Sequence, residues 1–450
     1  MTKVFYRDLK CDMPVAASGD GIYLIDSAGK RYMDASGGAA VSCLGHSDAD
    51  VIQAIKDQLD KVAFAHNGFM TSEPAEELAE FLVDAAPSDN KDGGIGMVYF
   101  VSGGSEAVEA ALKMTRQYFL ETGQPERTRF IARRQSYHGN TLGALSVGGN
   151  VCRREPYKEM LMPTSHIAPC NPYRDRLDTE SEEEYGLRVA NELEAEIERL
   201  GPRNVAGFIA ETVGGATAGV LVPVPGYFKR IREICDKHGV IMILDEIMCG
   251  MGRTGTLFAC EQDGVVPDII CIAKGLGAGY QPIGATLVSA KVYRAFEGGS
   301  GAFQHGHTYM GHPTACAASL AVQKKIRDHD LLSNVLKQGD NLVAALHDRI
   351  GNHPNVGDIR GRGLLRGIEL VADRSTKEPL NPTLKIHARV KKEALARGVI
   401  CYPGGGTADG VRGDHVMLAP PFIITEDQVS EIAGLIVVSI DAALQSAGVG

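Results

Sequence analysis

The chain has 450 residues, of which 44% are hydrophobic and 23% charged. This composition is typical of a soluble globular protein and excludes wholesale disorder. With 46 Lys and Arg against 56 Asp and Glu, the formal net charge is −10, which disfavours nucleic acid as the main partner.

Apolar runs and cysteines narrow the class of protein further. No uncharged apolar run approaches the roughly 18–20 residues of a membrane span, and residues 1–14 contain no apolar signal core. We therefore expect no membrane partner. The 10 cysteines form no C-x-x-C pair, so they predict reduced thiols in a cytoplasmic protein, without a disulfide framework or a zinc site.

In chain order, residues 15–45 predict short strands around a turn at 27–30, and residues 48–85 show helical spacing of apolar residues. The middle of the chain alternates short apolar runs with helical stretches, here Glu106–Phe119 and Gly226–His238. Such alternation predicts an α/β domain with a mostly parallel sheet covered on both faces. The strands expected there are Met97–Val101, Arg129–Ala132, Val205–Glu211, Val240–Asp245, Ile269–Ala273 and Gly284–Ser289.

After about residue 325 the pattern changes, with helices expected near 326–350 and 383–397, a strand at Gly363–Leu370 and a last helix from Glu426 to Leu444. We predict a smaller α+β domain built from both ends of the chain. Its parts are residues 1–60 and 326–450, and residues 61–325 form the large domain.

Four segments carry candidate chemistry, and the first is SGGSEAVEAALK from Ser102. A strand ends just before it and an Ala-rich helix follows. Gly103, Gly104 and Ser105 then present free backbone N–H groups at a helix N-terminus, an arrangement that suits a phosphate. The alternative is a Ser-capped helix after a flexible turn.

The second segment is VIMILDEIMCG, in which an apolar strand ends at Asp245 and Glu246. The carboxylate of Asp245 could face a ligand or cap the next turn. An apolar strand followed by Asp-Glu is also found in ATPases. The chain has no G-x-x-x-x-G-K-[ST] motif, however, so a nucleotide site would lack its phosphate-binding lysine.

The third segment, PDIICIAKGLGAGYQPIGA, places Lys274 directly after an apolar strand in a Gly-rich turn. Most lysines are solvated, but burial would lower the pKa of this amine and free it for Schiff-base chemistry. The fourth, QHGHTYMGHP, contains His305, His307 and His312. No carboxylate or cysteine lies close to them in the sequence, so we expect an anion-binding loop and no metal.

Together these segments describe a site for pyridoxal phosphate. They contain a phosphate cradle, a strand-end Asp, a strand-end Lys and the aromatic turn Ser136-Tyr137-His138-Gly139. The segments SGGSEA, SYHGNT, ILDEIMCGMGRTG, IAKGLGAGYQPIGA and HGHTYMGHP resemble those of the class III (ω-) aminotransferases. That family has the α/β fold type I of pyridoxal-phosphate enzymes. The resemblance extends from Asp34 to the segment APPFIITEDQ at Ala419.

The resemblance implies roles for single residues. Lys274 would hold the cofactor aldehyde and shuttle the proton, and Asp245 would pair with the pyridinium nitrogen. The other cofactor-binding residues implied are Gly103, Gly104, Ser105, Tyr137, His138, Glu211, Ile247 and Thr308. Tyr137 and Ile247 would cover the two ring faces. Thr308 would reach the phosphate of a neighbouring subunit in a homodimer or tetramer.

Substrate contacts follow less closely from the resemblance. Arg412 resembles the mobile arginine that binds a keto-acid carboxylate, although a surface role is the alternative. The small Ala39 and Ala40 replace an aromatic residue and would leave the pocket open to a longer donor. Departures from the family pattern are Thr212 in place of Pro and Gly103 in place of Ser or Ala. Arg360, Arg362 and Arg366 are expected to be structural.

The implied reaction moves an amino group from an ω-amine or amino acid to a small 2-oxo acid, with pyruvate favoured over 2-oxoglutarate. Its partners would be these small molecules. A racemase, aminomutase or phospho-lyase on the same scaffold is the alternative, because one fold can host several reactions. A nucleotide-binding module and an inactive homologue are more distant alternatives.

Overall fold

A seven-stranded sheet lies at the centre of the computed structural model, which describes residues 3–88 and 94–449. In spatial order its strands are β4 (Ile95–Val101), β10 (Gly284–Ser289), β9 (Ile269–Ile272), β8 (Ile241–Asp245), β7 (Val205–Glu211), β5 (Arg129–Arg133) and β6 (Thr164–Ile167). Strand β10 is antiparallel to β4 and β9, and the other pairs are parallel. The mostly parallel α/β sheet is therefore confirmed, with β6 as a strand the sequence pattern did not indicate.

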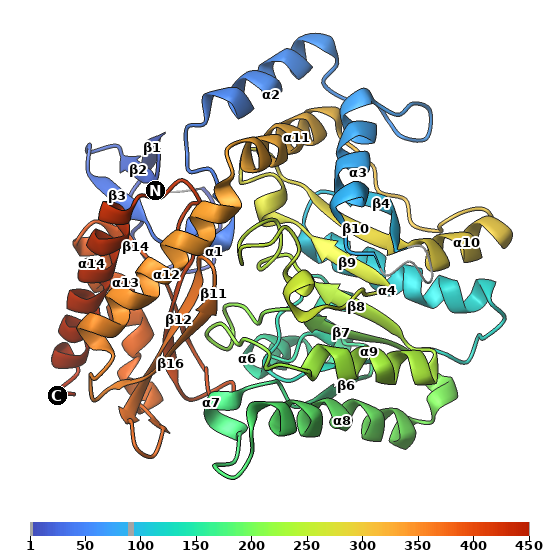
Figure 1. Cartoon of the computed structure of the whole chain (residues 1–450). Helices are drawn as coiled ribbons and strands as arrows, with labels where there is room; N and C mark the ends of the chain where they lie inside the picture. Colours follow the sequence, from blue (N-terminus) through green and yellow to red (C-terminus); the bar gives the residue numbers. More distant parts are fainter. Residues whose placement is uncertain (1–2, 89–93, 450) are drawn as a thin grey trace.

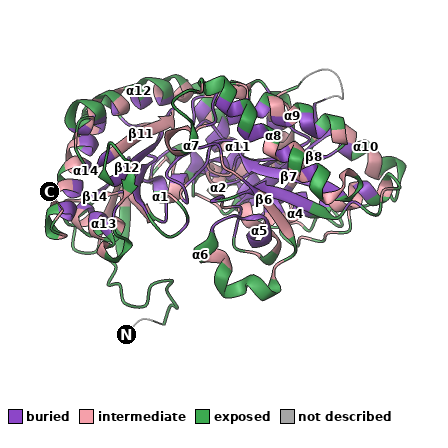
Figure 2. Ribbon diagram, turned by 90° about the horizontal axis from the view of Figure 1, so that it is seen from below, coloured by how far each residue is buried: buried purple, intermediate pink, exposed green. Residues whose placement is uncertain are grey.

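Side chains of the central strands enter two different cores. In β8, Ile241 and Ile243 pack on the face that carries helix α4 (Gly104–Glu121), whereas Met242 and Leu244 pack on the opposite face. Successive side chains of a strand point to opposite faces, so a strand apolar throughout must be covered on both sides. Figure 2 shows the buried strands between helices whose outer surfaces are exposed.

Helices on the second face form where local signals agree with the hydrophobic pattern. Helix α8 (Glu182–Leu200) starts with a capping box between Ser181 and Glu184, and α9 (Tyr227–His238) ends at Gly239, whose φ of 63° favours glycine. The helix expected at Gly226–His238 is thus confirmed, whereas α8 was not anticipated despite its Ser-x-x-Glu signal. Both helices lie side by side below the sheet in Figure 1.

The ends of the chain meet in a second lobe. Strand β3 (Arg31–Asp34) pairs in parallel with β14 (Val399–Ile400), and β1 (Ala16–Asp20) and β2 (Tyr23–Asp26) extend that sheet. In Figure 1 the blue N-terminal strands accordingly lie next to the red helix α14 (Glu426–Ser446). The neighbouring sheet contains β11 (Val356–Arg362), β12 (Leu365–Asp373), β16 (Asp414–Leu418) and β15 (Tyr402–Gly405), with β13 (Glu378–Pro379) at its side.

One helix connects the lobes. Helix α11 (Pro313–Asp328) places Ala315 and Leu320 in the core of the central sheet and Val322 and Ile326 in the core of the second lobe. It runs across residue 325, where the sequence pattern placed a domain boundary. The domain bounds at 60/61 and 325/326 therefore stay predictions.

The remaining elements complete the two lobes. The other α-helices are α1 (Gly37–Ala40), α2 (Ala49–Lys61), α3 (Glu73–Ala85), α5 (Leu142–Val147), α6 (Val151–Arg154), α7 (Pro172–Asp175), α10 (Ala290–Gly298), α12 (Leu331–Ile350) and α13 (Ile386–Ala396). Short 3₁₀ turns span Glu155–Met160, Pro202–Asn204, Ala259–Asp263, Lys274–Leu276 and Pro382–Leu384. In the described part of the chain, α14 alone is long and apolar enough to cross a membrane. It packs on α12 and α13, as the core helix of a globular protein does.

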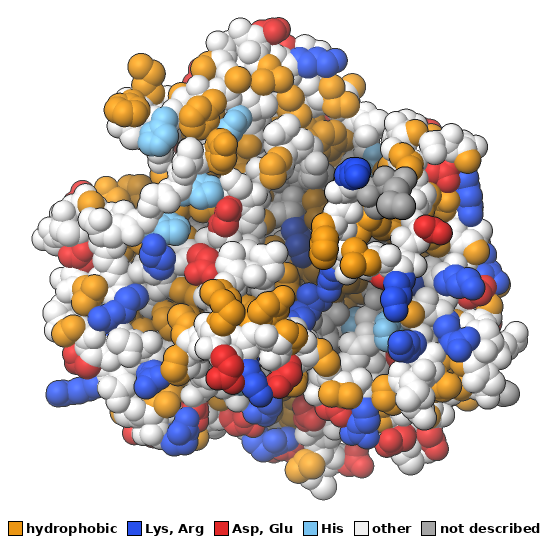
Figure 3. Space-filling view, turned by 180° about the vertical axis from the view of Figure 1, so that it is seen from behind, with side chains coloured by type: hydrophobic (Ala, Val, Ile, Leu, Met, Phe, Trp, Pro, Cys, Tyr) orange, Lys and Arg blue, Asp and Glu red, His pale blue; other side chains and the backbone are white. Residues whose placement is uncertain are grey.

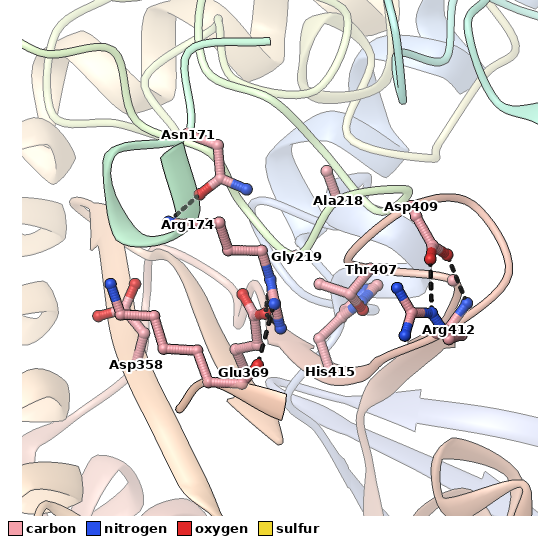
Figure 4. Close-up of polar contacts among 12 residues, drawn as sticks. Asn171, Arg174, Ala218, Gly219, Asp358, Glu369, Thr407, Asp409, Arg412 and His415 are labelled. Carbon is pink, nitrogen blue, oxygen red and sulfur yellow. Dashed lines mark hydrogen bonds and ion pairs between the residues drawn. The ribbon is translucent and has the colours of Figure 1, made fainter. Parts of the chain in front are cut away.

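A buried carboxylate joins the two lobes. Glu369 on β12 has no exposed surface, and its carboxylate accepts hydrogen bonds from Arg174 Nε at 2.7 Å and from Arg360 Nη1 at 2.6 Å. Arg174 belongs to α7 of the central domain, and Arg360 also donates to the carbonyl groups of Ala218 and Gly219. Figure 4 shows Arg174 reaching across to Glu369. Arg360 is structural, as the sequence analysis expected.

Replacing Glu369 by alanine should destabilise the fold strongly. Two arginines would then remain buried without their shared counter-charge, which typically costs about 3–5 kcal/mol. Urea unfolding followed by circular dichroism measures this cost. The exposed pair of Arg31 and Asp20 offers a control, because Asp20→Ala should cost less than about 1 kcal/mol. Equal effects of the two substitutions would contradict the structural role of Glu369.

Candidate active site

A cavity of about 540 Å³ opens at the carboxyl ends of the parallel strands. Ligands of such sheets bind at this edge, and the volume is ordinary for a small-molecule site. Nine of the residues singled out in the sequence line it: Gly103, Gly104, Ser105, Tyr137, His138, Glu211, Asp245, Ile247 and Lys274. Figure 3 shows one face of the molecule hollowed near its middle, with Lys or Arg side chains inside the hollow.

The register of the sheet brings the two carboxylates to the same edge. Glu211 ends β7 and Asp245 ends β8, and the two residues are direct partners in the parallel pairing. Glu211 is held by the buried Arg133, whose Nη2 lies 4.0 Å from Oε2. Burial raises the pKa of Glu211 above its usual range.

Asp245 is fixed by two donors. Nδ1 of His138 lies 2.7 Å from Oδ2, and the backbone N–H of Ile247 donates to Oδ1 at 3.0 Å. Both side chains of the His–Asp pair are nearly inaccessible to solvent. A hydrogen bond between an imidazole and a buried carboxylate fixes the orientation of both groups. Asp245 therefore presents a fixed carboxylate to this end of the cavity.

The adjacent acidic residue has a different role. Glu246 is fully buried, and its carboxylate accepts hydrogen bonds from Thr212 Oγ1 at 2.8 Å and from the backbone N–H groups of Ala259 and Cys260. It does not line the cavity. These donors saturate the carboxylate, so Glu246 holds the following loop in place, and an ATPase-like metal site on Asp-Glu gains no support.

Lys274 follows β9 in a strained backbone conformation. Its φ is +43°, in the left-handed region that non-glycine residues rarely adopt and that is concentrated at functional sites. A Cβ atom at the next residue, Gly275, would lie 3.0 Å from Cys43 Sγ, so the chain packs tightly there. Removal of water from Nζ lowers the pKa of Lys274 to about 8, although Asp245 and Glu211 favour its cation.

The start of α4 forms the opposite wall. Gly103 caps the helix without a side-chain hydrogen bond, and Gly104 begins it. A Cβ atom at Gly104 would lie 2.8 Å from Ile247 Cδ1, so glycine lets the helix N-terminus approach this side chain. Ser105 Oγ accepts a hydrogen bond from the backbone N–H of Asn140 at 3.0 Å, and its own proton remains available to an anion. The helix N-terminus and this hydroxyl suit a phosphate group.

The histidines of the fourth segment contact different side chains. His305 Nδ1 lies 2.8 Å from Lys113 Nζ, and His307 Nε2 lies 3.1 Å from Ser102 Oγ. Across residues 3–88 and 94–449, no group of three or more His, Cys, Asp or Glu side chains is placed to hold a metal ion.

Comparison with known proteins agrees with this geometry. The family model described as aminotransferase class-III matches residues 9–440. The chain belongs to the class-III aminotransferase family. It is 48% identical over 430 residues to an uncharacterized aminotransferase of Schizosaccharomyces pombe, covering 95% of this chain and 93% of that protein.

Solved aminotransferase structures have the same fold. The omega transaminase from Pseudomonas jessenii in complex with PMP is 33% identical, with a TM-score of 0.90 over 97% of this chain and 94% of that one. An amine transaminase from an uncultivated Pseudomonas species in its PLP-bound form is 37% identical, with a TM-score of 0.90 over the full length of both chains. The fold type I expected from the sequence is confirmed.

Pyridoxal 5′-phosphate is the cofactor of this aminotransferase. The residues present fit it, because the cavity joins a helix N-terminus suited to phosphate, a fixed carboxylate suited to a protonated ring nitrogen, and a lysine amine of lowered pKa. Tyr137 and Ile247 both line the space between these groups, as expected of residues that contact the ring. The individual roles stay predictions.

Three residues that the resemblance implied lie elsewhere. Ala40 is buried in a small core with Val213, and its neighbour Ala39 lines the cavity instead. Thr308 lies in the turn before α11 and does not line this chain's own cavity. Arg412 is held by Asp409, with Nε and Oδ2 2.7 Å apart, and it also remains outside the cavity.

Other lining residues were not anticipated from the sequence. They include Arg7, Arg153, Val213, Gly215, Ala216, Thr217, Met248, Gln281, Pro282 and Tyr402. The residues after Glu211 follow directly from the end of β7, so their position beyond a strand end was a usable signal. Arg7, Arg153 and Tyr402 come from distant segments, and no local pattern indicated them.

The lowered pKa of Lys274 predicts how its amine reacts with pyridoxal phosphate. Only the neutral amine attacks an aldehyde, so the initial rate of capture by cofactor-free protein should rise with pH around a midpoint of about 8. Absorbance gives the rate, and borohydride reduction with peptide mapping locates the label. The exposed Lys158 is the internal control, because it lies outside the cavity and should carry no label. Labelling at another residue, or a midpoint for Lys274 near the ordinary lysine value of about 10.4, would contradict the assignment.

Proposed function

We propose that this aminotransferase moves an amino group from an ω-amine or amino acid to a small 2-oxo acid, with pyruvate favoured over 2-oxoglutarate. The observation that carries the proposal is the placement of Lys274, Asp245 and the N-terminus of α4 around one cavity. Pyruvate is favoured because the resemblance to the ω-aminotransferases implies a small 2-oxo acid as the acceptor.

When bound, the cofactor supplies an aldehyde that condenses with amines and a protonated ring that accepts electrons from the substrate carbon. Asp245 holds the proton on the ring nitrogen, because its carboxylate is fixed by His138 and Ile247 and cannot turn away. The N–H groups at the start of α4 and the hydroxyl of Ser105 bind the phosphate.

Lys274 then moves the proton. Its neutral amine takes a proton from the substrate carbon that carries the transferred nitrogen. It then delivers this proton to the carbon on the other side of that nitrogen. A pKa of about 8 leaves a usable neutral fraction near pH 7, and bases with a pKa close to the working pH are effective. The amine stays close to its target because Lys274 is anchored between β9 and the tightly packed Gly275.

A homodimer is part of the proposal. Side chains of two neighbouring loops are exposed although apolar, among them Phe69 at 88% and Tyr309 at 56%, and Phe64 contacts Tyr309. Large exposed apolar patches mark interaction surfaces. Figure 3 shows hydrophobic and histidine side chains gathered toward the top of that face. Thr308 lies on one of these loops outside its own cavity, which supports a contact to a partner's phosphate.

Replacing the two central residues should separate their roles. Lys274→Ala should abolish turnover, whereas Asp245→Asn should keep cofactor binding and lower kcat by about 100-fold or more, because the ring nitrogen loses its fixed negative charge. Donor-dependent absorbance changes measure both. Lys158→Ala is the matched surface control. Full activity of Asp245→Asn would contradict the role of this carboxylate.

The acceptor preference is tested with one amine donor and either pyruvate or 2-oxoglutarate. We expect a higher kcat/KM with pyruvate, measured by product formation. A higher value with 2-oxoglutarate would overturn the preference but leave the transaminase reaction intact. Turnover without any acceptor would instead indicate a racemase, aminomutase or phospho-lyase.

A further inference from the structure

The cavity that contains Lys274 continues into a second one. A space of about 680 Å³ shares five lining residues with it, namely Arg7, Arg153, Ala216, Thr217 and Tyr402. The second space extends to the loop around Gly404–Gly406 and to helix α13 through His387 and Lys391. A substrate that reacts at Lys274 can therefore extend past these shared residues, which we call the junction.

The junction carries positive charge without a counter-charge. Among the described residues, no carboxylate lies within ion-pair distance of Arg7 or Arg153. The acidic groups on the walls already have partners, because Asp245 contacts His138, Glu211 lies 4.0 Å from Arg133, and Asp414 contacts His387 at 2.5 Å. Lys391 adds a further cation in the second space. A substrate group at the junction is therefore favoured if it is an anion.

Arg153 is held in a defined position on the wall. Its guanidinium carbon lies 4.7 Å from the centroid of the Tyr137 ring, and its backbone N–H donates to Asn150 Oδ1 at 3.2 Å. The neighbouring Arg154 differs, because its side chain donates to the carbonyl groups of Leu145 and Gly148. Arg153 is thus anchored through the aromatic ring while its N–H donors remain available for a carboxylate.

Arg412, the residue that resembles the family's mobile arginine, is committed to other groups. Asp409 accepts hydrogen bonds from its backbone N–H and its Nε, both at 2.7 Å, and Glu378 lies 3.6 Å from Nη1. Figure 4 shows Arg412 joined to Asp409 within one loop. Arg412 lines neither of the two connected spaces.

We infer that Arg153, and not Arg412, binds the carboxylate of a donor whose amine reacts at Lys274, so that Arg153 selects donors with an anionic group remote from the amine. The inference rests on the proposed transaminase function. It assigns a specificity-determining residue on α6 and predicts that the donor carboxylate lies at the junction.

The test compares ω-amino acids with alkylamines of equal carbon number as donors to the holoenzyme. The wild type should prefer the acid at one or more chain lengths. Arg153→Leu should lower that preference roughly tenfold or more, mainly through KM, because one charge-assisted hydrogen-bonded pair is lost. Arg153→Lys should restore part of it. Arg412→Leu and the surface variant Lys158→Leu should retain it.

A second readout does not depend on turnover. Alkanoates of the same lengths carry the carboxylate but no amine, and calorimetric titration of the holoenzyme measures their binding. We expect weaker binding to Arg153→Leu and wild-type binding to Arg412→Leu. Loss of binding or preference in Arg412→Leu or in Arg7→Leu, with Arg153→Leu unaffected, would overturn the inference.

The outcomes also separate this inference from the proposed function. Turnover of alkylamines without any preference for the acid would overturn the role of Arg153 and leave the transaminase function standing. No turnover of any donor would remove the proposed function, and the alkanoate titrations would then decide whether Arg153 binds a carboxylate.

Discussion

The parallel pairing of β7, β8 and β9 is the constraint on which the site depends. It places Glu211 directly opposite Asp245 and brings Lys274 to the same edge two residues after β9 ends. Because both faces of these strands are buried, the edge is poor in water. The lysine loses hydration and its pKa falls, and the carboxylates need fixed partners, which His138 and Arg133 provide. The reactivity of the site is thus a consequence of how the sheet is covered.

Two residues that line the same cavity have a strained backbone. Lys274 and Ala39 both have positive φ although neither is glycine. Such conformations cost of order 1–3 kcal/mol each and persist only where the surrounding structure enforces them. Here the enforcing contacts come from close packing, as at Gly275 against Cys43 and Gly104 against Ile247. The fold therefore loses some folding free energy in order to hold the lysine and the helix N-terminus where a cofactor needs them.

Substrate selection involves a different part of the molecule. The cofactor-facing residues lie on strand ends and on α4, whereas the junction combines the N-terminal segment, α6, the loop after β7 and Tyr402 of the second lobe. The two lobes are held together by buried charge, with Glu369 between Arg174 and Arg360. A rigid relation between the lobes keeps the wall formed by Tyr402 at a fixed place relative to Lys274. Chemistry and selectivity can therefore vary separately in such a fold.

Local sequence was enough for six strands of the central sheet, for the alternation of strands and helices, and for the position of Asp245 and Lys274 at strand ends. An apolar run followed by Asp245 or Lys274 indicates a buried strand with a chemically active residue at its end. The glycines after Val101 indicate a helix N-terminus whose backbone N–H groups are not covered by side chains. The same reasoning missed the short strand β6 and helix α8, whose capping box was visible. It placed a domain boundary inside α11, a helix whose side chains enter two cores, and that boundary stays a prediction.

Contacts between distant segments could be decided only by the folded chain. Arg153 and Arg412 are both arginines near glycine-rich loops, and nothing in their local sequence says that Arg153 lines an open cavity whereas Arg412 does not. The same holds for Glu246, whose local sequence does not show that Thr212 and the turn at Ala259 bind its carboxylate. The face on which a side chain lies follows from the periodicity of its own strand or helix. The groups that compensate its charge come within a few ångströms of it only through tertiary packing.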